Sequence, residues 1–219
     1  MSSDTLGFAI ILLPVLLFSM TIHEMMHAFA ADWLGDDTAR LMGRLSLNPI
    51  KHIDPILTVA APLLLLLSHL PPFGAAKPVP VNFNRLKYDE FGGAIVGVVG
   101  PLTNLVIALL ASALFQHINL GYGGLAYQIV GMMILMNVSF FLLNIIPWPP
   151  LDGSRLLYAF APRPLQEMMA HIEGMGMASL LIFLVIFWTV LAQANGPFVH
   201  LIDSFINHLA PGFLQFLNQ

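Results

Sequence analysis

LGFAIILLPVLLFSMTIHEMMHAFAA, residues Leu6–Ala31, is apolar over a length that can cross a bilayer, yet its second half carries His23, Glu24 and His27. A helix needs about 20 apolar residues to span the hydrocarbon core. A charged side chain in the middle of such a helix costs at least roughly 2.5 to 3.5 kcal/mol, so these polar residues need a compensating partner. The stretch therefore predicts a membrane helix that carries a polar site.

The composition of the whole chain indicates an integral membrane protein. Of its 219 residues, 58% are hydrophobic and 9% are charged, whereas soluble domains have roughly 25% charged residues. The polar stretches are too short for a second domain, so we expect one membrane-embedded domain over residues 1–219. The formal net charge is -4, and no basic stretch points to nucleic acid. The first basic residue is Arg40, so we expect no cleaved signal peptide.

Further apolar segments predict an all-α polytopic bundle of about four to six membrane-embedded segments. The segments 91–115, 124–146 and 177–191 have the length and composition of spanning helices. Residues 198–217 fit either a last span or an interfacial helix. The alternation over Arg40–Leu47 favours a short hairpin, and prolines exclude regular helix over 73–84. The insertion between the first two spans is therefore expected to be small, with some strand and a re-entrant part.

The motif His23-Glu24-Met25-Met26-His27 is the H-E-x-x-H pattern of metalloproteases. Residues four apart lie about 6 Å apart along a helix and about 40° around it, so both imidazoles can reach one metal ion. Glu24 then lies beside the ion, where it can take a proton from the attacking water and pass it to the leaving amine. The chain has no cysteine, so a metal ligand must be His, Asp or Glu.

A catalytic zinc ion needs a third protein ligand and one open position. The best candidate is Asp152, the next-to-last residue of the run NIIPWPPLDG over Asn144–Gly153. Three prolines break a helix there, and broken helix at membrane depth is tolerated only where protein or water satisfies the backbone. The pattern therefore favours His23, His27 and Asp152 as ligands of one Zn²⁺ ion per chain.

An alternative function remains open, a metal or proton transporter that uses the same His, Glu and Asp residues. A pathway through the membrane favours polar residues along several helices, whereas here they gather at one depth. The amides of Asn104 and Asn137 can also be explained as hydrogen bonds that join two helices.

Three motifs in order resemble the site-2 protease family of intramembrane zinc metalloproteases, in its small prokaryotic branch without a PDZ domain. They are HEMMH at 23–27, GPLTN at 100–104 and NIIPWPPLDG at 144–153. The resemblance implies that His23, His27 and Asp152 bind zinc, that Glu24 is the catalytic base, and that Asn144 helps to hold the substrate. It also implies a transmembrane protein as substrate, without naming it, and leaves the oligomeric state open.

The eight basic residues predict the orientation in the membrane, since all lie between residues 40 and 51, 77 and 87, or 155 and 163. The positive-inside rule places all three groups in the cytoplasm. A cytoplasmic position of all three groups requires residues 55–72 to enter the membrane and return on the same side. With this re-entrant path, the helix that carries HEMMH and the helix that leads to Asp152 run in the same direction. We therefore expect a multi-pass protein of a prokaryotic inner membrane with its active site in the cytoplasmic half of the bilayer.

An unwound substrate needs partners for its freed backbone groups, because lipid offers none. The segment Val79–Asn84 can present an extended edge for main-chain pairing, so Val79, Val81 and Asn82 are candidate substrate-binding residues. Asn144, eight residues before Asp152, is the candidate that would bind the substrate with its side-chain amide.

Overall fold

A computed structural model describes residues 3–67, 76–191, 193 and 196–217. Three of its helices are long and apolar enough to cross a membrane: α1 (Ser3–Trp33), α4 (Asp89–His117) and α5 (Leu125–Asn144). They match the predicted spans at 6–31, 91–115 and 124–146 within a few residues. The prediction of an all-α polytopic membrane protein is confirmed.

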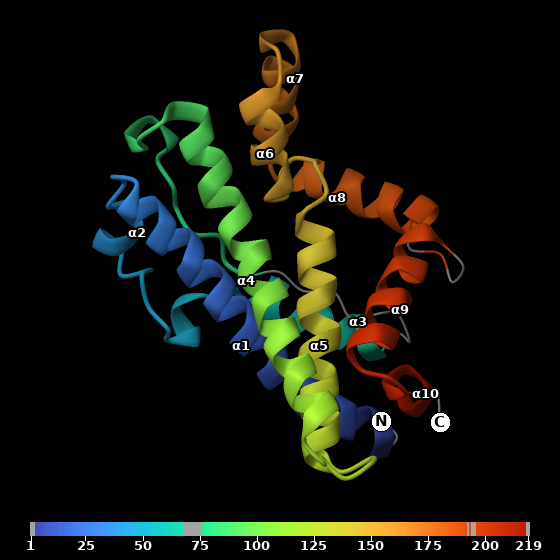
Figure 1. Cartoon of the computed structure of the whole chain (residues 1–219). Helices are drawn as coiled ribbons and strands as arrows, with labels where there is room; N and C mark the ends of the chain where they lie inside the picture. Colours follow the sequence, from blue (N-terminus) through green and yellow to red (C-terminus); the bar gives the residue numbers. More distant parts are fainter. Residues whose placement is uncertain (1–2, 68–75, 192, 194–195, 218–219) are drawn as a thin grey trace.

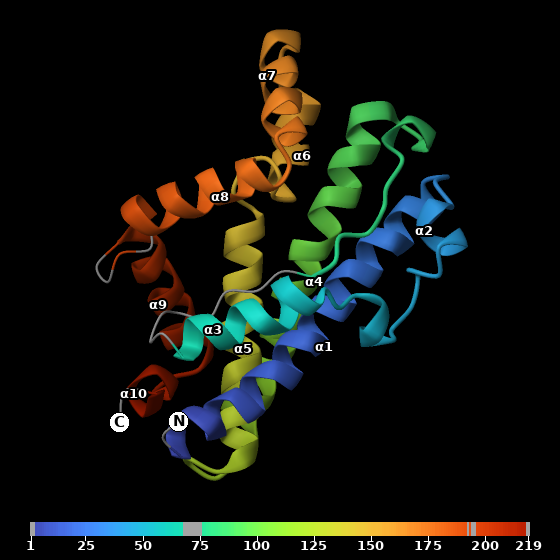
Figure 2. The same cartoon turned by 180° about the vertical axis from the view of Figure 1, so that it is seen from behind.

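The three long helices lie side by side and alternate in direction (Figures 1 and 2). α1 and α5 run toward the same end of the bundle, and α4 runs the opposite way between them. The C-terminal half of α1 and the residues after α5 therefore meet at one level. This parallel arrangement is what a metal site shared by the two helices requires.

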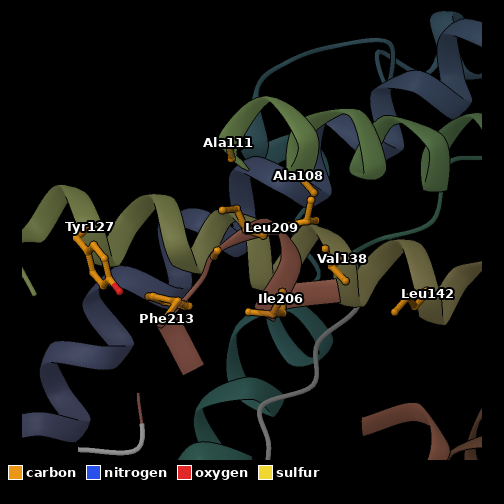
Figure 3. Close-up of a cluster of buried hydrophobic side chains, with 10 residues drawn as sticks. Ala108, Ala111, Tyr127, Val138, Leu142, Ile206, Leu209 and Phe213 are labelled. Carbon is orange, nitrogen blue, oxygen red and sulfur yellow. The ribbon is translucent and has the colours of Figure 1, made fainter. Parts of the chain in front are cut away.

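A large apolar core lies between α4, α5 and the C-terminal helices α9 (Pro197–Leu209) and α10 (Phe213–Leu217). Phe213 fits against α5 at Gly131, where an added Cβ would lie 2.2 Å from the Phe213 ring. Figure 3 shows how side chains from four helices converge there; the buried members are Ala108, Ala111, Tyr127, Ile134, Val138, Leu142, Ile206, Leu209, Ala210 and Phe213.

The predicted hairpin over Arg40–Leu47 is wrong, because none of these residues forms a strand. They begin in a short helix, α2 (Thr38–Leu41), and continue in turns. The Asp36 side chain accepts a hydrogen bond from the Thr38 N–H, which favours a helical turn. Gly43, with φ +67°, then ends the turn in the left-handed conformation that glycine adopts without a steric penalty. Local capping therefore outweighs the alternating pattern.

The segment after α2 consists of η1 (Pro49–Lys51), the π-helix η2 (Pro55–Ala60) and α3 (Ala61–Leu67). α3 lies across the long helices near the middle of their length (Figure 2). The Lys77 N–H donates to the His52 carbonyl over 2.9 Å, so the chain returns to the place from which it left. This is the path that a re-entrant element requires. The expected position of residues 68–75 falls outside the described part of the chain.

The structure contradicts one C-terminal prediction and excludes one of the two alternatives for residues 198–217. α8 (Met177–Ile186) continues in the π-helix η4 (Phe187–Leu191), and together they lie across the bundle (Figure 1). They are long enough for a span only in combination with α7 (Arg163–Gly174), and the chain bends by 102° between α7 and α8. α9 has 13 residues and is separated from α10 by a turn at Pro211-Gly212, so 198–217 is not one continuous span. α6 (Gly153–Phe160) and α7 extend beyond the end of α5 (Figure 1).

Candidate metal centre

The structure brings together His23, His27 and Asp152, the three predicted metal ligands. Asp152 Oδ2 lies 3.0 Å from His23 Nε2 and 3.4 Å from His27 Nε2, and the two Nε2 atoms are 2.9 Å apart. Both imidazoles are buried, with 7% and 6% of their residue surface exposed. In the part of the chain that the structure describes, these residues form the one group of His, Asp and Glu that could hold a metal ion.

The outer nitrogen of each imidazole faces a hydrogen-bond acceptor. His27 Nδ1 lies 2.6 Å from the Val96 carbonyl, and His23 Nδ1 lies 2.5 Å from Asn104 Oδ1. Each Nδ1 must therefore carry its proton, which leaves a lone pair on each Nε2 if the rings are neutral. Two lone pairs and a carboxylate oxygen then face one another, an arrangement that a bound metal ion would stabilise.

A row of buried amides fixes which atom of Asn104 faces His23. The Met133 carbonyl and the Ser19 hydroxyl accept from Asn137 Nδ2, each over 2.8 Å. Asn137 Oδ1 consequently points toward Asn104 and accepts from its Nδ2 over 2.8 Å. The acceptor atom of Asn104 is left for His23. Sequence reasoning explained both amides equally well as links between helices, so it missed this role in holding a metal ligand.

The donor set fits a catalytic zinc ion. Ligand atoms about 2.0 to 2.1 Å from a tetrahedral zinc ion lie roughly 3.3 to 3.4 Å from one another, close to the three separations of 2.9, 3.0 and 3.4 Å. Two imidazole nitrogens and one carboxylate oxygen are also a common ligand set of catalytic zinc, with a fourth position left for water or substrate.

Two glycines of α4 give the ligands room. A Cβ at Gly100 would lie 2.3 Å from His27 Nε2 and 2.7 Å from His23 Nε2, and a Cβ at Gly97 would lie 2.8 Å from the Asp152 carbonyl oxygen. α4 can therefore approach both ligand-bearing segments only because these positions have no side chain. Both glycines therefore allow close packing of α4 against the candidate metal site.

Glu24 lies beside the ligands at the wall of a cavity of about 310 Å³. Its Oε2 accepts a hydrogen bond of 3.0 Å from the Val79 N–H. The cavity is also lined by His27, Asp152 and the valines at 79 and 81. A carboxylate with one oxygen held by the backbone and a metal ligand nearby is suited to accept a proton from water.

The candidate substrate-binding residues divide into two groups. Val79 and Val81 line the cavity, whereas Asn82 and Asn144 are absent from its described walls. The Asn82 N–H donates to Asp36 Oδ2, and its side chain accepts from the Asn84 N–H, so Asn82 is already engaged. Asn144 Nδ2 donates to the Phe140 carbonyl in its own helix.

The cavity has a polar wall that the sequence did not predict. Arg155, three residues after Asp152, forms an ion pair with Glu173 of α7. Its guanidinium also lies 4.0 Å from the centre of the Phe83 ring. All three residues line the cavity. The sequence shows that Arg155 follows Asp152 by three residues. It contains no signal that indicates Phe83 or Glu173 as the partners of Arg155.

Fold and site together define a helical membrane protein with a buried H-E-x-x-H motif whose histidines, with Asp152, could hold a zinc ion, and with a glutamate next to them. The chain is 38% identical over 191 residues to the Bacillus subtilis protein named "Putative zinc metalloprotease YwhC", covering 83% of this chain and 82% of that protein. The chain belongs to the site-2 protease family of zinc metalloproteases, which are hydrolases.

Two more distant relatives carry the same description under the name Rip2. The Mycolicibacterium smegmatis protein is 27% identical over 180 residues, with 82% of this chain and 68% of that protein covered. The Mycobacterium tuberculosis H37Rv protein is 26% identical over 177 residues, with 80% and 67% covered. No family model and no solved structure matches the chain.

Proposed function

We propose that this zinc metalloprotease cleaves transmembrane proteins at peptide bonds within or near the bilayer, and that its active site lies in the cytoplasmic half. The observation that carries the proposal is the position of the ligands. His23 and His27 belong to a helix that can span the membrane, and Asp152 follows another such helix closely. A site at this depth serves a substrate that is itself in the membrane.

The residues of the chain divide the chemistry among them. His23, His27 and Asp152 hold the zinc ion, which when bound polarises a carbonyl and lowers the pKa of water. Glu24 accepts a proton from the attacking water and delivers it to the amine that leaves. The buried amides keep His23 in the tautomer that presents Nε2 to the ion.

We name residues 77–83 the strap, because they run from the His52 contact past Glu24 to η3 (Phe83–Arg85). The Val79 N–H donates to Glu24, whereas the described residues provide no acceptor for the Val81 N–H. Because Val79 and Val81 both line the cavity, an unwound substrate can pair its main chain with the strap next to the zinc centre.

The orientation follows from the basic residues, which gather at one end of the bundle. Arg40 pairs with Asp32, the Lys87 N–H donates to the Leu34 carbonyl, and Arg155 packs on Phe83, so a member of each basic group lies near the C-terminal end of α1 or near the strap. The positive-inside rule favours the cytoplasmic face for this end, in the inner membrane of a bacterium.

The experiment that tests the proposal uses the full-length, zinc-loaded protein in liposomes with single-span substrates. The wild type should cut them, and mass spectrometry should place the cuts within or next to the apolar segment. Glu24→Gln should bind zinc as the wild type does and cut nothing, because an amide cannot accept the proton. Cuts confined to water-soluble loops, or equal rates for both proteins, would contradict the proposal.

A further inference from the structure

Asp36 is a buried carboxylate that lies outside the metal site and that the chemistry above does not use. It follows the end of α1 by three residues, and none of its surface is exposed. A buried charge is costly unless hydrogen bonds compensate it. Its partners therefore show which parts of the chain it holds together.

The two oxygens of Asp36 bind different segments. Oδ1 accepts from the N–H and the hydroxyl of Thr38, at the start of α2. Oδ2 accepts from the N–H of Asn82 over 2.6 Å, and Asn82 is 46 positions away in the sequence. Burial opposes ionisation, but the bonds from Thr38 and Asn82, helped by Arg85 at 3.9 Å, lower the pKa of Asp36 below its ordinary value. The ionised form is what the site stabilises.

The strap is consequently tied to α1 and its C-terminal extension at two points. Val79 bonds to Glu24, and Asn82 bonds to Asp36. The Val81 N–H lies between these points. α1 also carries His23 and His27, so the helix that holds the zinc ion also fixes the strap.

We propose that Asp36 is a positioning residue of the protease: it anchors the strap at Asn82, so that the Val79 N–H meets Glu24 and the Val81 N–H faces the substrate. This inference rests on the proposed function of the strap as the partner of the substrate main chain. A role in α2 alone would not require the bond to Asn82.

The first test is Asp36→Asn in the full-length, zinc-loaded protein. The amide keeps the shape of the side chain but replaces one acceptor oxygen by a donor, which then faces an N–H or O–H donor. Cleavage of a single-span substrate should fall about tenfold in kcat/KM, mainly through a higher KM. The zinc content and the Tm should stay close to those of the wild type. The matched control is Asp37→Asn, a half-buried neighbour paired with Arg85, which should cleave within about twofold of the wild type.

The second readout does not depend on cleavage. The chain has no cysteine, so Val81→Cys introduces a single thiol on the strap. In the Asp36→Asn background this thiol should react several-fold faster with a maleimide than in the wild-type background, because the strap is released. If the wild type cuts no transmembrane substrate, the proposed function fails, and the labelling rate still decides the role of Asp36.

A third pair of variants covers the case in which Asp36→Asn does not fold. Asn82→Pro removes the backbone N–H that donates a hydrogen bond to Asp36. Asn82→Ala keeps this N–H and loses only the hydrogen bond from the Asn84 N–H to the Asn82 side chain. Asn82→Pro should raise KM more than Asn82→Ala does. It should also raise the labelling rate of the thiol introduced by Val81→Cys more than Asn82→Ala does. Wild-type KM and labelling in Asp36→Asn and Asn82→Pro would overturn the inference. So would loss of zinc in both, since Asp36 would then maintain the whole fold.

Discussion

The Nδ1 atom of His23 lies 2.5 Å from Oδ1 of Asn104, so an amide on α4 orients a metal ligand on α1. Asn104 is fully buried, and its own orientation is set by Asn137 on α5. The three long helices therefore meet in one hydrogen-bonded row at the depth of the metal centre. Such a group fixes the tautomer and the orientation of the imidazole that it contacts, and thereby supports metal binding.

Asn104→Ala should weaken zinc binding about 10- to 100-fold, because His23 loses the acceptor that fixes its tautomer. Asn104→Asp keeps an acceptor oxygen toward His23 and should retain more affinity than the alanine variant. Competition with a chromophoric chelator measures both. An unchanged Kd for Asn104→Ala would mean that the amide only joins the helices.

Replacing a ligand should remove the metal. His23→Ala, His27→Ala and Asp152→Ala each leave two protein ligands, too few for a stable zinc site. Zinc per chain, measured by elemental analysis after dialysis, should fall from about one toward zero. His171→Ala, at an exposed position of α7, is the control and should stay near one. Full zinc in Asp152→Ala would identify another residue as the third ligand.

Gly100→Ala should abolish zinc binding although it changes no ligand. The added methyl group would lie 2.3 Å from His27 Nε2, where α4 and the metal centre are in closest contact. Gly174→Ala is the matched control, since a Cβ there meets no atom within 4 Å. Both variants would be compared in zinc content and Tm. A zinc-loaded Gly100→Ala protein would show that α4 can move away from the site at little cost.

Single cysteines test the orientation in the membrane. Cysteines at Asn84 and Ala170, both exposed, should react with an impermeant thiol reagent only from the cytoplasm, and one at Asn119 only from outside. Ser154, although it lies in the same predicted cytoplasmic region, is buried and therefore unsuitable. External labelling at Asn84 would mean that residues 55–72 cross the membrane.

Asn144→Ala should keep zinc and Tm while losing about tenfold in kcat/KM on a single-span substrate, equivalent to about 1.4 kcal/mol of transition-state stabilisation. The Asn144 Nδ2 group donates a hydrogen bond to the Phe140 carbonyl. Within the described chain, the Asn144 side-chain oxygen has no hydrogen-bond partner. That oxygen is available to a substrate N–H. A Tm that falls in proportion to the activity would instead assign Asn144 to the packing of α5.

The spans and the grouping of His23, His27 and Asp152 could be predicted from the sequence because each depends on a strong local signal. Apolar length identified α1, α4 and α5, and the spacing of His23 and His27 placed both on one helix face. Asp152 was harder to predict as a member of this group, because His23 and His27 lie on a helix that is far away in the sequence. It was found because three prolines break the chain just before it.

The missed features depend on long-range contacts that leave no periodic pattern. The bonds of Asp36 to Asn82 and of Asn104 to Asn137 join residues that are 46 and 33 positions apart. In the sequence, each of these side chains has an ordinary explanation as a cap or a helix link. The false hairpin has the opposite origin. Its alternation was real but short, and Gly43 together with the hydrogen bond from the Thr38 N–H to Asp36 decided the local structure.

The hydrogen bond from the Lys77 N–H to the His52 carbonyl brings together the two ends of the segment between these residues. The metal ligands and Glu24 lie outside this segment, and the strap begins at Lys77, where the segment ends. An insert between His52 and Lys77 would leave the two ends of the segment side by side. A protein engineer can therefore use the two residues of this contact as the ends of a graft, and we expect zinc binding to persist in the grafted protein.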